Sequence, residues 1–520
     1  MFLLLILLMT AISNSSSIAW EQLGQDIDGE APFDRSGATL SMSSDGQIVA
    51  IGALKNDGNG NSAGHVRMYS FNGTTWSQLG QDIDGEAEGD ESGYSVTLSS
   101  DGNTVAIGTP MNDGNGYDSG HVRVYRFGGF SWIQLGQDID GEVEGDYSGW
   151  SVALSLDGNT VAIGAPDNGG NGNFAGHTRV YRFDGTTWSQ LGQDIDGENE
   201  YDGSGMSIDL ADNGETVAIG ATSNDGNGNL AGHARVYRFD GTTWSQLGQD
   251  IDGEAEGDEF GWSVSLSSDG NTVACGAPVN VGNGGQTGHV RVYSFGGTTW
   301  SQVGQDIDGE AGGDFSGVAV SLSSDGDTVA IGASNNAGNS GISGQGHVRV
   351  YRFGGATWSQ LGQDIDGEEE LDYSGVAVSL SSDGNIVAIG APYNVGNGED
   401  SGHVRVYRLP PTQSPTDAPT DAPTAPPTSP PTAPPTDAPT VPPTVPPTDA
   451  PTDAPGNTPT DAPTDAPTGA PTDAPTDAPT VNLKGETDSD NTTIWIVVGA
   501  VITPTVLAMV LYYFLKNRYI

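Results

Sequence analysis

A tryptophan recurs along this chain at a nearly constant interval, and this period constrains the fold more than any other feature. The interval is 56 residues five times and 58 residues once. A fixed period of this length is typical of repeat proteins, in which each unit buries its core against its neighbours. The positions are Trp20, Trp76, Trp132, Trp188, Trp244, Trp300 and Trp358. We therefore interpret residues 20–409 as seven copies of one unit.

Each copy contains four segments with the composition of β-strands and none with a helical period. In the second copy these segments are 94–99 (YSVTLS), 104–108 (TVAIG), 121–127 (HVRVYRF) and 131–136 (SWIQLG). β-branched and aromatic residues dominate them, and the Asp-Gly between the first two favours a tight hairpin. Four antiparallel strands repeated seven times predict an all-β fold, a seven-bladed β-propeller, because a ring removes most exposed sheet edges.

The two ends of the repeat region complement each other. The seventh copy ends at residue 409 without a tryptophan strand, whereas residues 20–24 supply such a strand before the first complete copy. We predict that the N-terminal strand becomes the outermost strand of the last blade and closes the ring.

The charge of the chain limits its partners. The sequence has 68 acidic and 17 basic side chains, of which residues 409–520 hold 12 and 3, so the repeats carry 56 and 14. Such an excess of negative charge repels phosphates and argues against nucleic-acid binding, and favours cations, polyols or basic protein surfaces. The one cysteine, Cys275, stands in an apolar strand where most copies have Ile. It can form no intrachain disulfide, and we expect a small buried hydrophobe.

The segments outside the repeats predict a membrane-anchored protein. Residues 1–19 are interpreted as a signal peptide, cleaved after residue 13 or 19. Residues 410–493 are predicted to form a disordered Pro/Thr/Asp-rich, mucin-like stalk, and are followed in the sequence by an apolar run at 494–515 and a basic tail at 516–520. The apolar run is long enough for a transmembrane helix, and the basic tail places it as a single-pass type I plasma-membrane protein with the propeller outside. A GPI signal is the alternative. Sequons suggest glycosylation at Asn72 and Asn491.

An acidic segment, Asp-Ile-Asp-Gly-Glu, recurs in the connection between the fourth strand and the next copy. Oxygen ligands at alternate positions beside a glycine turn suit Ca²⁺, although the spacing is not that of an EF-hand. The alternative is that these side chains make hydrogen bonds that hold a long turn. The candidate metal ligands are Asp26, Asp28, Asp82, Asp84, Glu86, Asp90, Asp138, Asp140, Asp194, Asp196, Asp250, Asp252, Asp306, Asp308, Asp364 and Asp366.

Alternating strand direction places this acidic connection and the connection between the second and third strands on one face of the ring. The seven histidines all stand just before the third strand, which indicates a repeated structural contact rather than a catalytic residue. An arginine two positions later, such as Arg123, needs either a partner, for which the acidic segment is the natural source, or exposure at the rim. No catalytic constellation distinguishes one copy, so we expect no enzymatic activity; a hydrolase or lyase would need a titratable cluster in one blade.

Two segments of the fifth copy, FGWSVSLSSDGNTVACGAP (260–278) and GHVRVYSF (288–295), resemble the FG-GAP repeat of the head propeller of integrin α subunits. The Gly-Ala-Pro of this repeat also stands at 164–166 and 390–392, and the resemblance extends over all seven copies. It implies a β-propeller. The calcium loop of integrin repeats lies between the first two strands, which Ser-Ser-Asp-Gly-Asn joins here, so those calcium sites are not implied.

These features together predict a cell-surface adhesion or recognition protein. An acidic propeller on a glycosylated stalk would meet an extracellular protein or glycan ligand, in a manner that depends on Ca²⁺ if the acidic segments bind it. A lectin or polysaccharide-binding protein with one weak site per blade is the alternative, in which the repeated tryptophans and Asn/Asp loops contact sugars. A structural coat component is a further possibility.

Overall fold

The computed structural model describes residues 19–282, 285–337 and 344–410. All of them lie in the first of two compact units, Met1–Asp421. The stalk beyond residue 410, the apolar run at 494–515, the tail, Asn491 and nearly all of the predicted signal peptide lie outside the described residues. Within the described ranges, no helix has the length and apolar character needed to cross a membrane.

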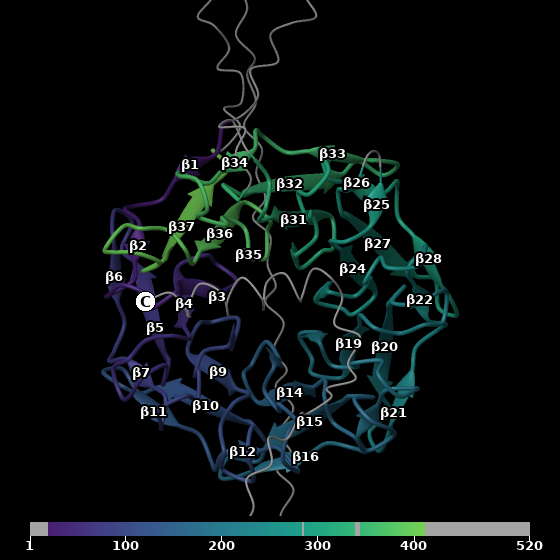
Figure 1. The fold of residues 1–520 in the computed structure, drawn as a ribbon, viewed down its shortest axis with the longest axis horizontal. Coiled ribbons are helices and arrows are strands. Elements are labelled where there is room, and N and C mark those ends of the chain that lie inside the picture. The colour runs from purple at the N-terminus through teal and green to yellow at the C-terminus, as the bar shows by residue number, and fades with distance from the viewer. Residues whose placement is uncertain (1–18, 283–284, 338–343, 411–520) are drawn as a thin grey trace, which may run out of the picture. The chain divides into compact units, whose positions relative to one another are not determined.

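The fold is all-β and consists of seven antiparallel sheets, the blades, arranged in a ring (Figure 1). Blade 1 contains β3 (Ser36–Met42), β4 (Ile48–Ala53), β5 (His65–Phe71), β6 (Trp76–Gln78) and β7 (Ile83–Asp84). Blade 2 contains β8 (Ser95–Leu98), β9 (Thr104–Thr109), β10 (His121–Phe127), β11 (Trp132–Gln134) and β12 (Ile139–Asp140). Blade 3 contains β13 (Ser151–Leu154), β14 (Thr160–Ala165), β15 (His177–Phe183), β16 (Trp188–Gln190) and β17 (Ile195–Asp196).

The remaining blades repeat this pattern. Blade 4 contains β18 (Ser207–Leu210), β19 (Thr216–Ala221), β20 (His233–Phe239), β21 (Trp244–Gln246) and β22 (Ile251–Asp252). Blade 5 contains β23 (Ser263–Leu266), β24 (Thr272–Ala277), β27 (His289–Phe295), β28 (Trp300–Gln302) and β29 (Ile307–Asp308), with a separate pair, β25 (Val281–Gly282) and β26 (Gly285–Gln286). Blade 6 contains β30 (Ala319–Leu322), β31 (Thr328–Ala333), β32 (His347–Phe353), β33 (Trp358–Gln360) and β34 (Ile365–Asp366).

Blade 7 joins the two ends of the repeat region, as the sequence predicts. It contains β35 (Ala377–Leu380), β36 (Ile386–Ala391), β37 (His403–Arg408), β1 (Glu21–Gln22) and β2 (Ile27–Asp28). β1 and β2 both pair antiparallel with β37, with Glu21 opposite Arg408 and Ile27 opposite Val404. In Figure 1 these purple N-terminal strands lie beside the green β37. The N-terminal strand therefore closes the ring.

Each blade has five strands rather than the four that the sequence predicts. The fifth is the Ile-Asp pair of the acidic segment, which returns to the third strand of its own blade, as β7 does to β5. A glycine allows the bend between the fourth and fifth strands. Gly80 has a φ of 82°, and a Cβ there would lie 2.7 Å from the Trp132 ring of the next blade. A short two-residue strand gives no alternating pattern, so composition does not reveal it.

Backbone hydrogen bonds also close the ring at the turns between the first and second strands. Ser44 N donates to Ser100 O at 2.9 Å, and the same bond continues from blade to blade. The last one runs from Ser382 N back to Ser44 O, also at 2.9 Å. The described turns thus form a complete circle, which an open stack of sheets could not make.

The hydrophobic core lies between neighbouring blades. One cluster joins Ala106 and Val122 of blade 2 to Val161 and Ile163 of blade 3, and comparable clusters occur at the other junctions. The repeated tryptophans complete these junctions: the Trp132 indole is 4% exposed, and its Nε1 donates to Leu79 O of the preceding blade at 2.8 Å. Cys275 is fully buried in the same kind of core, as predicted, and burial raises its pKa.

Candidate functional site

Two connections of every blade lie side by side on one face, which we call the loop face. In blade 1 the connection between β4 and β5 hydrogen-bonds to the connection that follows β7. Asn59 Nδ2 donates to Gly85 O at 2.8 Å, and Ser92 N donates to Ala63 O at 2.9 Å. The two connections share one face, as the strand directions predict, and hydrogen bonds to the neighbouring loops fix the acidic segments.

The last acid of each loop stabilises the turn. Asp90 is 4% exposed, and its Oδ2 accepts hydrogen bonds from Ala87 N at 3.1 Å and from Asn112 Nδ2 of the next blade at 3.0 Å. This is the hydrogen-bonded turn of the alternative interpretation. The equivalent residues are also buried: Asp34, Asp146, Asp202, Asp258, Asp314 and Asp372.

The second acid of each segment lies beside the loop that joins the second and third strands. A Cβ at Gly58 would contact Asn56 Oδ1 at 2.9 Å and Asp84 Oδ1 at 3.6 Å, so two oxygens flank this glycine. Partial burial and the neighbouring Asp82 raise the pKa of Asp84. The pKa values of the equivalents Asp28, Asp140, Asp196 and Asp252 are raised for the same reasons. Asp308 and Asp366 hold the same strand position in β29 and β34.

The first acid of each segment belongs to a different group, which crosses a blade junction. Asp82 meets His65 of its own blade and Glu30 of the preceding acidic segment, with one ligand atom of each within 4.8 Å of the others. The acids of one loop are thus divided, because Glu86 of the same segment lies with His121 and Asp138. Further groups are Glu142, His177 and Asp194; Glu198, His233 and Asp250; and Glu368, His403 and Asp26.

In the remaining junctions, the first acid likewise lies near the histidine of its own blade. Asp306 Oδ1 is 3.7 Å from Arg291 Nε, and its charge opposes the lowering of the His289 pKa by burial. Asp364 Oδ1 accepts a hydrogen bond from Gln360 Nε2 at 2.6 Å and acts similarly on His347.

The histidines are buried and uncharged at neutral pH. His121 is 1% exposed; burial and then the nearby Arg123 lower its pKa to about 4. The same two causes, burial first, bring the pKa to about 4 in His65, His177, His233, His347 and His403. A neutral imidazole keeps a lone pair that a metal ion or a proton donor can use.

The repeated arginines bind the acidic segments, which is the first of the two alternatives that the sequence leaves open, and are not exposed at the rim. Arg123 is 5% exposed; its Nη2 donates to Asp84 O at 3.0 Å and its Nη1 lies 3.3 Å from Glu86 Oε1. The sequence does not show that one Glu, one His and one Asp lie together at each of these blade junctions. The residues stand 35 and 17 positions apart along the chain, as for Glu30, His65 and Asp82. Only the junction between two blades brings them together.

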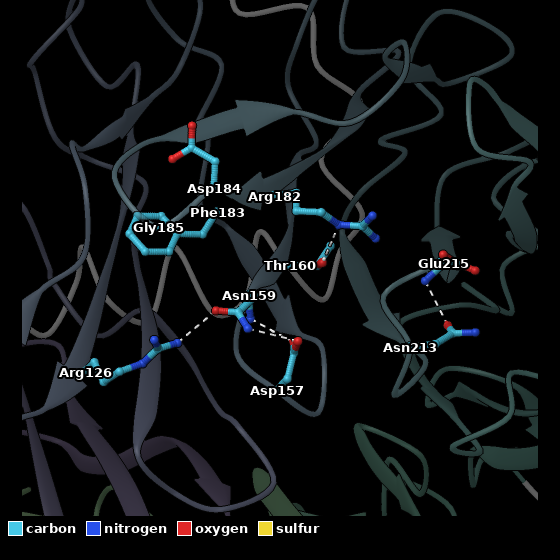
Figure 2. Close-up of a pocket in the computed structure, with 10 residues that line it drawn as sticks. All are labelled: Arg126, Asp157, Asn159, Thr160, Arg182, Phe183, Asp184, Gly185, Asn213 and Glu215. Atoms are coloured by element: carbon cyan, nitrogen blue, oxygen red, sulfur yellow. Dashed lines mark hydrogen bonds between the residues drawn. The ribbon is translucent and has the colours of Figure 1, made fainter. Parts of the chain in front are cut away.

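The opposite face, formed by the short hairpins, has a polar pocket of about 600 Å³ between blades 2, 3 and 4 (Figure 2). Its side chains bind one another: Arg126 Nη2 donates to Asn159 Oδ1 at 3.0 Å, and Asn159 Nδ2 donates to Asp157 Oδ2 at 2.9 Å. Asn72, the sequon residue within the described ranges, is exposed in another of these hairpins. The pocket is open to solvent, and its polar side chains already hydrogen-bond to one another. The loop face is therefore the better candidate site.

Residues 251–293, from β22 into β27, match the model of the FG-GAP repeat. The chain carries an FG-GAP repeat in a seven-bladed β-propeller. This match includes Phe260, which is fully buried beneath the Arg291 guanidinium, 5.5 Å from its ring centre. A search of the curated proteins found no match to the chain. The FG-GAP propeller is a fold typical of integrin-like binding domains.

Proposed function

We propose that this chain is a cell-surface adhesion or recognition protein that presents its acidic loop face to an extracellular partner. The proposal includes the stalk, the single type I span at 494–515 and the plasma membrane as its location. The observation that carries it is the loop face itself: one acidic segment recurs seven times on it, fixed by hydrogen bonds from neighbouring loops. Repetition of one exposed surface favours multivalent binding over catalysis, so we assign no enzymatic role.

The charge of the loop face supports a basic or cation-bridged protein partner. Calcium is the proposed cation, and the residues that would hold it are Asp84 and its equivalents beside Asn56 and its equivalents. The pKa of Asp84 is raised by partial burial and by Asp82, so its negative charge is unfavourably placed without a cation. Oxygen donors of this kind are those that Ca²⁺ prefers. Bound calcium would supply positive charge between the loops and acidic groups of a partner.

The test is the adhesion of cells that display the full-length chain to surfaces coated with a basic protein, an acidic protein or neutral glycans. We expect adhesion to the basic protein, and to the acidic protein with calcium. A variant with Glu144→Gln and Glu200→Gln, both exposed on the loop face, should adhere less strongly. The control carries Glu215→Gln and Asp327→Asn, two exposed acids of the hairpin face. Equal loss in both variants, or adhesion to none of the surfaces, would contradict the proposal.

A glycan ligand is the second candidate, and two side chains of the loop face favour it. Phe174 and Tyr201 are 49% and 53% exposed, and their rings stack with centres 5.9 Å apart and planes inclined by 25°. Exposed aromatic rings suit contact with sugar rings, whereas the seven repeated tryptophans are buried between blades. Binding to a glycan array that Phe174→Ala abolishes would favour the lectin over the protein-binding role.

A further inference from the structure

The junction that closes the ring contains a Glu–His–Asp group built from three separate segments. Asp26 lies between β1 and β2, Glu368 follows β34 of blade 6, and His403 begins β37 of blade 7. One ligand atom from each lies within 4.8 Å of the other two. The group therefore spans the point where the two ends of the repeat region meet.

Within the described residues, the His403 ring is buried, and one of its two nitrogens makes no hydrogen bond. The residue is 1% exposed, and within the described residues its Nε2 has no hydrogen-bond partner. Its Nδ1 faces Glu368 Oε2 at 3.9 Å, which is too long for a hydrogen bond. Buried polar side chains are nearly always satisfied, and an exception indicates a ligand or a role that the protein groups alone do not reveal.

The separation of His403 Nδ1 from Glu368 Oε2 and the donor types fit a shared metal ion. Two atoms that each lie about 2.1 Å from one zinc ion are about 3 to 4 Å apart, and 3.9 Å falls in this range. One imidazole nitrogen with two carboxylates is a ligand set for a borderline metal such as Zn²⁺, whereas Ca²⁺ prefers oxygen alone.

The net charge around the Glu–His–Asp group is negative and favours binding of a divalent cation. Arg405 Nη1 lies 3.5 Å from Glu368 Oε1, so the guanidinium occupies one oxygen of this carboxylate and leaves Oε2 toward His403. Gln22 Nε2 donates to Asp26 Oδ1 at 2.6 Å, which fixes the second carboxylate. Two carboxylates and one guanidinium sum to one negative charge, which a divalent cation offsets.

We propose that the Glu–His–Asp groups at the blade junctions bind a divalent transition-metal ion of the Zn²⁺ class, and that at the closing junction this ion ties the N-terminal segment to blades 6 and 7. The site uses Asp26 and its equivalents, and so differs from the calcium ligands proposed above, which are Asp28 and its equivalents. It goes beyond the adhesive function and does not depend on it.

The test is calorimetric titration of the chelator-stripped full-length protein with ZnCl₂, with the metal content measured after desalting. Asp26→Asn removes one ligand charge and keeps the oxygen that Gln22 binds. We expect this variant to bind one zinc ion fewer per chain than the wild type and to gain less thermal stability from zinc. The control is Glu21→Gln, which removes an exposed charge of the same segment, 3.4 Å from Arg408 and outside the group.

Each outcome decides the matter. Absence of zinc binding, or equal zinc content in the Asp26→Asn variant and the wild type, would overturn the proposal. Displacement of the bound zinc by an equal concentration of CaCl₂ would overturn the choice of metal. If the full-length protein binds zinc as expected but cells that display it do not adhere, only the proposed adhesive function is contradicted. The two proposals can therefore fail separately.

Discussion

Asp209, on β18 of blade 4, is a charged residue at a position where several other blades have a serine. Ser41 and Ser265 hold the same position in blades 1 and 5, and their Oγ atoms accept a hydrogen bond from a backbone N–H of the next blade. Asp209 Oδ2 accepts the equivalent bond from Leu266 N at 2.7 Å. Burial raises its pKa to about 6. The carboxylate performs the task of a hydroxyl and adds a charge that the site disfavours.

We predict that Asp209→Ser stabilises the protein at neutral pH. The pKa in the folded state, about 6, exceeds the ordinary value of 3.8, so the folded state binds the proton more tightly than the unfolded state. The stability that comes from this tighter proton binding is present below pH 4 and is lost as the pH rises through 6. The variant should therefore gain up to about 3 kcal/mol at pH 7.5, and progressively less toward pH 4.

Urea unfolding at several pH values measures this difference. Glu256→Gln, at an exposed position of the loop face, is the control that removes a charge without emptying a buried site. A gain of equal size at pH 7.5 and pH 4 would show that packing, and not the charge of Asp209, limits stability.

At the scale of the element, the N-terminal strand closes the ring through its tryptophan. The Trp20 indole is 7% exposed within the cluster between blades 6 and 7, and its Nε1 donates to Leu361 O at 3.0 Å. We predict that Trp20→Ala lowers the free energy of unfolding by about 3–5 kcal/mol, the usual cost of removing a buried tryptophan. Phe130→Ala, at a residue that is 94% exposed, should cost little.

Hydrogen exchange should locate the effect of Trp20→Ala. Opening of β1 and β2 exposes the edge of β37, so backbone protection should fall most in blade 7. Uniform loss of protection in all blades would mean that the strand does not act as a separate closing element.

Elements and residues differ in how far the sequence could predict them. The four longer strands of a blade and the burial of Cys275 follow from local composition, which one copy already contains. The closing strand follows from the repeat period and from the two ends of the repeat region. The fifth strand was missed because Ile83 and Asp84 are too few to show alternation. The Glu30–His65–Asp82 group was missed because its members meet across a blade junction, and the sequence does not specify which side chains face each other there.

At the scale of the whole propeller, the arginines offset only part of the negative charge of the acidic side chains. The repeats carry 56 acidic and 14 basic side chains, and the repeated buried arginines, such as Arg123 and Arg179, each pair with a glutamate of the preceding segment. The other acids lie mainly on the exposed loops, where like charges repel through water. Salt weakens repulsion between exposed charges, because the Debye length shortens, and affects the buried pairs much less.

The melting temperature of the full-length protein should therefore rise with ionic strength, by at least about 3 °C between 10 and 500 mM NaCl. A fall would mean that the arginine pairs contribute more to stability than repulsion removes.

A comparison of calcium with sodium distinguishes ion binding from charge screening. If Asp84 and its equivalents bind Ca²⁺, millimolar CaCl₂ raises the melting temperature beyond NaCl of the same ionic strength, and MgCl₂ does so less because Mg²⁺ dehydrates reluctantly. Coincident curves for the three salts would reduce the acidic segments to hydrogen-bonded turns whose charge acts only at long range.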